Sequence, residues 1–288
     1  MRSFKEFHPL TQALFFISVL IATMFDMHPI LLMISIIAAA LYTGYIGGIK
    51  ALLKTMELML VTSIMIIIIN PLISHEGITV LAKLPDGNDL TLESIIFAAA
   101  AALMMSGAVY WFYCINRIFT SDRIIYLFGK ITPKLALMIS MTLNFMSKFK
   151  SHLEELKAAR YSEKTSSKLI NSINIISSLL QWSAENAVDT ADSMKSRGYG
   201  LKKRTGYTRF KLTSYDVVYM LIILLADFYL WLLISTGNLS FSYYPFFEIE
   251  SNGITAMSGY IVYAVLCVIP FFTDVKGDIK WRYMTSKL

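Results

Sequence analysis

Long apolar runs alternate with short polar breaks in the first 117 residues and again in the last quarter of the chain. A helix needs about 20 residues to cross a bilayer, and most of these runs have that length. We expect a membrane-spanning helix over each of six ranges: 10–25, 29–47, 53–73, 93–117, 215–236 and 255–273. The first two are short and nearly adjacent, which predicts a tight helical hairpin. The pattern therefore predicts an all-α, polytopic membrane protein of about six spans.

Between the fourth and fifth runs the pattern becomes amphipathic, and it predicts two long helices. The first begins at Thr132-Pro133, a suitable N-cap followed by a proline in the first turn. Its apolar positions recur in steps of three and four, as one helical face requires. They are Met138, Met141, Phe145, Phe149, Leu153 and Leu156. This helix is expected to end near Arg160, where a polar, turn-like segment follows.

The second amphipathic helix has a stripe of its own. Its members are Leu169, Ile173, Ile176, Leu180, Ala184, Ala187, Ala191 and Met194. The stripe stops before Gly198 and Gly200, and glycine is the usual residue at a helix C-terminal cap. We expect the two helices to cross and pack, and to leave apolar surface for a further partner.

Each stripe, when extended, reaches an arginine at the helix end. Arg160 lies four residues after Leu156, and Arg197 lies three residues after Met194. Both arginines therefore fall on the apolar face, where a guanidinium needs a carboxylate or a ring of carbonyls. The alternative is that each basic residue only offsets the helix macrodipole beside an ordinary C-cap.

Charge divides the chain into three parts and predicts its orientation. Residues 1–118 and 213–288 hold the predicted spans, about four and about two, and residues 119–212 hold most of the 26 Lys and Arg residues. With both termini in the cytoplasm, every Lys and Arg except Lys83 lies on the cytoplasmic side. This agrees with the positive-inside rule, so residues 119–212 are expected to be a cytoplasmic region.

Composition narrows the chemistry. The chain is 56% hydrophobic and only 16% charged, whereas a soluble domain carries about a quarter charged residues. No Gly-x4-Gly-Lys-Ser/Thr loop is present, so any ATP would bind to another chain. We expect no metal site and no cofactor in this chain. The net charge of +6 indicates contact with anionic lipid rather than nucleic acid.

One ionisable residue, Asp227, falls near the middle of the fifth predicted span. Such a residue is a functional candidate, although a hydrogen bond to a neighbour such as Asn70 or Tyr229 is the alternative. The small residues from Ala98 to Ala102, with Gly107, predict close helix packing. A secondary transporter would need several such polar positions and internal symmetry, and remains the alternative function. A membrane-bound enzyme is disfavoured, since no convergent catalytic set is visible.

The motif order resembles one transporter family. The segments Ala158-Ala159-Arg160 and Ser196-Arg197-Gly198-Tyr199 are similar to two Ala-Arg-Gly signatures of the transmembrane T subunit of energy-coupling factor importers. Asn70-Pro71-Leu72 with the following Glu76 to Thr79, Pro133, and Arg204 to Tyr207 with Asp216 resemble further segments of that family. Two departures are Tyr161 in place of the first motif's glycine, and Ser196 in place of alanine.

The resemblance implies an assembly in a bacterial plasma membrane. Two cytoplasmic ATPases, which hold ATP and Mg, would grip the two helix tips, and a separate membrane subunit would bind a vitamin or a transition-metal ion. The implied ATPase contacts are Ala158, Ala159, Arg160, Ser196, Arg197 and Gly198. The surface expected to pack on the substrate-binding subunit is Met138, Met141, Phe145, Phe149, Ile173, Ile176 and Leu180. This chain itself would be non-catalytic and would transmit motion.

Overall fold

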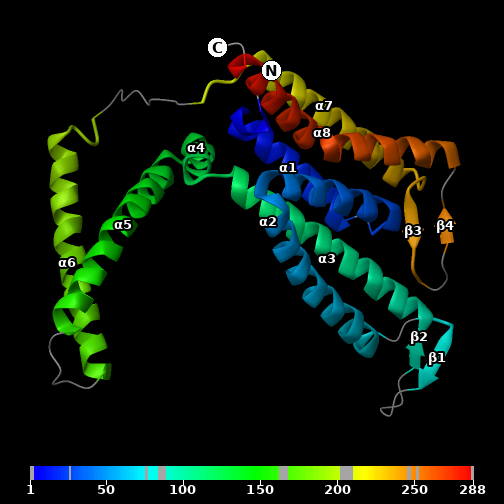
Figure 1. Cartoon of the computed structure of the whole chain (residues 1–288), viewed down its shortest axis with the longest axis horizontal. Helices are drawn as coiled ribbons and strands as arrows, with labels where there is room; N and C mark the ends of the chain where they lie inside the picture. The colour runs from blue at the N-terminus through cyan, green and yellow to red at the C-terminus, as the bar shows by residue number, and fades with distance from the viewer. Residues whose placement is uncertain are drawn as a thin grey trace. The chain divides into compact units, whose positions relative to one another are not determined.

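The computed structural model describes residues 3–25, 27–74, 77–83, 89–161, 168–201, 210–244, 248–250 and 253–286. Over these residues the fold comprises eight α-helices, one short 3-10 helix and two β-hairpins (Figure 1). The helices are α1 (Pro9–Phe25), α2 (Pro29–Ile73), α3 (Leu92–Ile118), α4 (Ser121–Ile131), α5 (Pro133–Tyr161), α6 (Lys168–Ser196), α7 (Ser214–Ser235) and α8 (Gly253–Thr285). The 3-10 helix η1 is Phe4–Glu6, and the strands are β1 (Val80–Lys83), β2 (Asp89–Thr91), β3 (Ser240–Ser242) and β4 (Glu248–Glu250).

The chain divides into two compact units. The first unit comprises Met1–Thr120 and Phe210–Leu288, and the second comprises Ser121–Arg209. Within the described residues, α2, α3, α7 and α8 are long and apolar enough to cross a membrane, and α1 is a shorter apolar helix. All of these belong to the first unit. The structure thus shows an all-α chain with the helices of a membrane protein.

Helix α2 reverses direction at Gly48. That residue has φ 74° and ψ 176°, a backbone conformation that side-chain-bearing residues rarely adopt. Before the break, Ser35 accepts a hydrogen bond from the Trp111 indole of α3 at 2.9 Å. After it, Ser63 bonds Ser106 of α3 at 3.0 Å. Thr43, also before the break, lies 3.3 Å from the Cys114 sulfur of α3. Contacts therefore move toward the C-terminus of α3 before Gly48 and back toward its N-terminus after it, so the two halves of α2 run in opposite directions. Where a loop near residues 48–52 was expected, helix continues on both sides of one glycine.

The first unit is held together by an aromatic core and by polar cross-links. Rings from η1, α1 and α3 meet edge to face, and Phe15 lies 5.8 Å from Trp111 between ring centroids. Thr23 of α1 bonds Ser35 at 3.0 Å and the Tyr263 hydroxyl of α8 at 3.1 Å, so one hydroxyl joins three helices. Gly107 and alternate alanines of α3 (Ala98, Ala100 and Ala102) are buried, as expected for small residues that let neighbouring helices approach, whereas Ala99 and Ala101 are partly exposed.

Two buried carboxylates fasten the N-terminal segment to the last two helices. Asp274 of α8 accepts hydrogen bonds from the Ser3 hydroxyl, from the Phe4 amide at 2.7 Å and from the Tyr42 hydroxyl at 3.0 Å. Asp216 of α7 accepts from the His8 amide at 2.9 Å, so α7 is tied to the start of α1. Both carboxylates are almost inaccessible to solvent, and a buried carboxylate is tolerated only where donors satisfy it.

The second unit consists of α4, α5 and α6. Helix α4 is amphipathic and packs on the start of α5, where Gly129 allows a close approach to Ala136. Thr132 occupies the predicted N-cap position of α5, where its carbonyl accepts from the Ala136 amide at 3.2 Å, but its hydroxyl donates to the Phe128 carbonyl of α4 and does not cap α5. Helices α5 and α6 then form an antiparallel pair (Figure 1). Their C-terminal ends consequently lie at opposite ends of the pair.

Candidate functional site

The α5–α6 pair packs through aromatic side chains in its middle. The Trp182 ring of α6 stacks on Phe145 with centroids 5.4 Å apart and on His152 with centroids 4.4 Å apart. Leu179 of α6 is 6% exposed and lies on the same side of its helix as Trp182. On α5 the stripe predicted from the sequence forms this contact, since Phe145, Phe149 and their neighbours are partly covered, while Met138 stays exposed.

On α6 the predicted stripe lies on the opposite side, facing outward. Ile173, Ile176 and Leu180 are 64%, 57% and 65% exposed, and Leu169 is 76% exposed. The helix packs on α5 through a face that carries Leu179, Trp182 and several small or polar residues, and it leaves its more apolar face uncovered. A continuous apolar strip of this kind is unusual on the surface of a chain that functions alone. Of the packing surface expected from the sequence, Ile173, Ile176, Leu180 and Met138 are therefore free to contact a partner.

Helix α6 ends in a Schellman motif built on Gly198. The Tyr199 amide donates to the Met194 carbonyl at 2.9 Å, and the Gly198 amide donates to the Lys195 carbonyl at 2.9 Å. Gly198 has φ 79°, which this motif requires at the residue after the C-cap. Arg197 occupies the C-cap position, so the predicted glycine cap is confirmed. All bonds of the motif are backbone bonds, and the Arg197 side chain takes no part in them.

The Arg197 side chain projects into solvent at this end of α6. It is exposed, and it makes no hydrogen bond or ion pair with the residues that the structure describes. Ser196 is also exposed, and its hydroxyl donates to the Ser193 carbonyl at 2.8 Å. Two residues before Arg197, Lys195 lies 3.7 Å from Asp192, an ordinary exposed i,i+3 pair. The tip thus presents one guanidinium that has no partner among the described residues.

The other expected tip is the end of α5. Ala158 and Ala159 are exposed in the last turn of that helix. Arg160 and Tyr161 belong to the same turn, and their side chains lie outside the part of the structure that is described. Because the helices are antiparallel, this tip is at the far end of the pair from Arg197. Residues from the two motifs therefore cannot converge on one site.

Asp227 has a partner that the sequence did not indicate. Its carboxylate accepts a hydrogen bond from the Ser18 hydroxyl of α1, rather than from Asn70 or Tyr229. Tyr229 instead bonds Ser258 of α8 at 2.7 Å. The arrangement joins α7 to α1 within the first unit. In the described residues no group of three or more His, Cys, Asp or Glu side chains is arranged to hold a metal ion.

Comparison with protein-family models and with curated proteins finds no match to this chain.

Proposed function

We propose that the chain is the transmembrane T subunit of an energy-coupling factor importer, in a bacterial plasma membrane. In this proposal two cytoplasmic ATPases bind the α5 and α6 tips, and a separate membrane subunit binds a vitamin or a transition-metal ion. The chain would have six spans, with the two halves of α2 counted separately, and both termini in the cytoplasm. It would transmit motion and perform no catalysis.

The main observation in support of the proposal is the structure of α6. Its apolar stripe is uncovered, and its backbone-built cap holds Arg197 at the very end of the helix, where the guanidinium has no partner among the described residues. Because the backbone of Arg197 is fixed by the cap and its guanidinium is exposed, the residue is suited to a bidentate contact with a carboxylate. The stripe beside it supports contact with a further apolar partner, for which Ile173, Ile176 and Leu180 supply the surface.

The antiparallel arrangement supports two ATPases rather than one. Helix α6 has 29 residues, and at 1.5 Å per residue it is about 44 Å long. The Arg160 and Arg197 tips, at opposite ends of the pair, are thus suited to reach separate protein chains. Closure of an ATPase dimer would move both tips together and shift the apolar strip between them, a rigid-element transmission.

Arg197→Ala tests the proposal. The cap contains only backbone bonds, so the helix is expected to stay intact. Loss of a desolvated Arg–carboxylate contact costs about 2–5 kcal/mol, which predicts at least thirtyfold weaker binding to the ATPases. The measurement is co-purification of the two ATPases with the tagged chain, followed by a binding titration and an uptake assay.

The matched control is Lys195→Ala, which removes a neighbouring exposed cation of the same turn. It should leave ATPase binding within about twofold, since an exposed i,i+3 pair contributes little. Binding and uptake that survive the Arg160→Ala, Arg197→Ala double variant would refute the coupling role. Uptake by the purified chain without any ATPase would instead favour a secondary transporter.

A further inference from the structure

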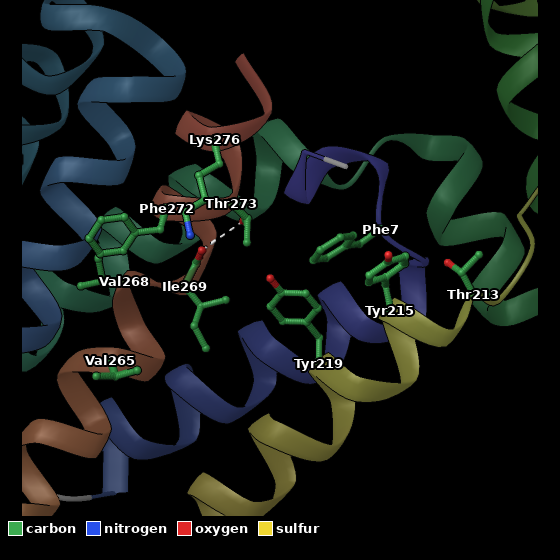
Figure 2. A pocket seen from close by; sticks show the side chains of 10 residues that line it. All are labelled: Phe7, Thr213, Tyr215, Tyr219, Val265, Val268, Ile269, Phe272, Thr273 and Lys276. Atoms are coloured by element: carbon green, nitrogen blue, oxygen red, sulfur yellow. Dashed lines mark hydrogen bonds between the residues drawn. The ribbon is translucent and has the colours of Figure 1, made fainter. Parts of the chain in front are cut away.

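A groove of about 660 Å³ lies between α7 and α8 in the first unit (Figure 2). Its volume falls within the range of about 300–1,000 Å³ that is typical of sites for small molecules. The buried Phe7 ring, which packs on Tyr219 with centroids 4.8 Å apart, closes part of its floor. The groove lies outside the second unit and plays no part in the coupling role proposed above. The lining residues are Phe7, Thr213, Tyr215, Tyr219, Val265, Val268, Ile269, Phe272, Thr273 and Lys276.

The α8 wall of the groove changes from apolar to polar along the helix. The α8 side chains that line the groove share one helical face, on which positions three or four residues apart are neighbours. Val265 and Phe272 belong to its apolar part, and Lys276 forms its polar end. The eleven helical steps from Val265 to Lys276 rise about 16 Å, which is close to half of the roughly 30 Å hydrocarbon core of a bilayer. The groove therefore has the depth of one leaflet, with its polar end at the level of the headgroups.

The polar end offers a positive charge, that of Lys276, with no ion-pair partner among the described residues. The Lys276 ammonium is exposed and has no hydrogen bond or ion pair with any residue that the structure describes. The hydroxyls of Tyr215 and Tyr219 likewise have no partner among those residues. The nearby carboxylates have donors of their own: the buried Asp274 is bonded to the N-terminal segment, and the buried Asp216 to the His8 amide and to Thr213 at the edge of the groove.

The apolar end opens sideways. Val265 and Phe272 are 60% and 58% exposed, whereas Val268 and Ile269 are partly buried deeper in the wall. An occupant can thus enter from the hydrocarbon region. Tyr215, at the other end, is of the residue type enriched where a membrane meets water.

We infer that this groove binds an anionic glycerophospholipid. One acyl chain lies along Val265, Val268, Ile269 and Phe272, and the phosphate contacts the Lys276 ammonium and the tyrosine hydroxyls. The lipid belongs to the leaflet in which α7 begins and α8 ends, the cytoplasmic leaflet by the charge distribution of the sequence. An apolar side chain of a partner subunit could fill the apolar half, but it would leave Lys276 without a counter-charge.

Native mass spectrometry of the full chain in detergent, without ATPases, tests the inference. Dioleoyl-phosphatidylglycerol is titrated against dioleoyl-phosphatidylcholine, and the wild type should retain one molecule of the anionic lipid preferentially. Lys276→Gln should weaken that retention about fivefold, the factor expected for one lysine near an anionic headgroup. Lys54→Gln, a matched exposed lysine on α2 outside the groove, should change it less than twofold.

A photoactivatable phosphatidylglycerol then locates the bound chain. Cross-links should concentrate on Val268, Ile269 and Phe272, and unlabelled anionic lipid should compete them away. Equal retention of the two lipids, an equal effect of both lysine variants, or cross-links spread evenly over α2 and α7 would each overturn the inference. Because no ATPase is present, these outcomes are independent of whether the coupling proposal holds.

Discussion

Replacing Asp274 by alanine should loosen the N-terminal segment and destabilise the whole first unit. The carboxylate accepts three hydrogen bonds, and two of the donors, the Phe4 amide and the Tyr42 hydroxyl, are on residues that are 1% and 0% exposed. Alanine would leave both donors buried without an acceptor. Each buried donor without an acceptor lowers the free energy of unfolding by about 1–3 kcal/mol.

The expected loss for Asp274→Ala is thus about 2–6 kcal/mol in the free energy of unfolding. The lower half of that range is favoured, because the variant also removes the desolvation cost of a buried charge. Chemical unfolding in detergent measures the free energy, and hydrogen–deuterium exchange measures the local effect. Amides of residues 4–8 should exchange faster than in the wild type by a larger factor than amides in the middle of α3.

Two comparison variants make this reasoning refutable. Tyr42→Phe removes one donor and leaves the carboxylate with two others, so it should cost only about 1–1.5 kcal/mol. Asp278→Ala, one turn later on α8, removes an exposed carboxylate that Tyr45 bonds, and should cost less than about 1 kcal/mol. A loss for Asp274→Ala no larger than that of Asp278→Ala, or unchanged exchange at residues 4–8, would show that the carboxylate does not hold the segment.

Two further predictions concern the bend of α2 at Gly48 and the N-cap of α2 at His28. Gly48→Ala should lower the free energy of unfolding by about 1–2 kcal/mol, since the φ of 74° at Gly48 is unfavourable for any residue with a Cβ. The control is Gly253→Ala, because a Cβ at Gly253 meets nothing within 4 Å. Equal unfolding free energies for the two variants would contradict the role of the bend. His28 precedes α2, and its Nδ1 accepts a hydrogen bond from the Ile30 amide. Burial lowers the pKa of His28 below its usual 6.5. The unfolded chain therefore binds a proton more readily, and stability should fall as the pH decreases through about 6.5, until His28 also titrates in the fold. His28→Asn keeps a good N-cap without titrating, so it should flatten the dependence of Tm on pH between 8 and 5; an unchanged slope would exclude His28 as the cause.

The apolar helices could be predicted from the sequence because length and hydropathy define them locally. Helices α1, α3 and α7 begin and end within a residue or two of the predicted ranges. The range 255–273 was too short, since α8 continues to Thr285. Charged residues after Thr273 end the apolar run, but Gly277 does not break the helix and no proline follows, so the helix extends past the apolar region. The two hairpins were missed because their strands of three or four residues are too short to give a clear period. Helix α4 was also missed, although its 11 residues are amphipathic.

The candidate site shows where a single sequence is insufficient. The period of α6 was recognised, but its apolar stripe faces outward, because Leu179 and Trp182 on another face make the contact with α5. Two apolar faces on one helix give the same periodic signal, and only the partner helix decides between them. Asp227 was singled out by its position, whereas the buried acceptor Asp274 gave no signal, because its donors Ser3, Phe4 and Tyr42 lie far away in the chain. Asp216 has a local signal, since it forms a capping box with Thr213 at the start of α7, but its bond from the distant His8 amide has none.

The attachment of the N-terminal segment also imposes an order on biosynthesis. Phe4 and its acceptor Asp274 are separated by 270 residues, and at about 5–20 residues per second a ribosome needs roughly 15–50 s to make that stretch. The segment that contains Phe4 must therefore wait about that long for α8 before it can dock. A chain cut short before α8 would present an undocked Phe4 and Phe7 to chaperones and proteases, so docking of this segment distinguishes chains that contain α8 from chains that lack it.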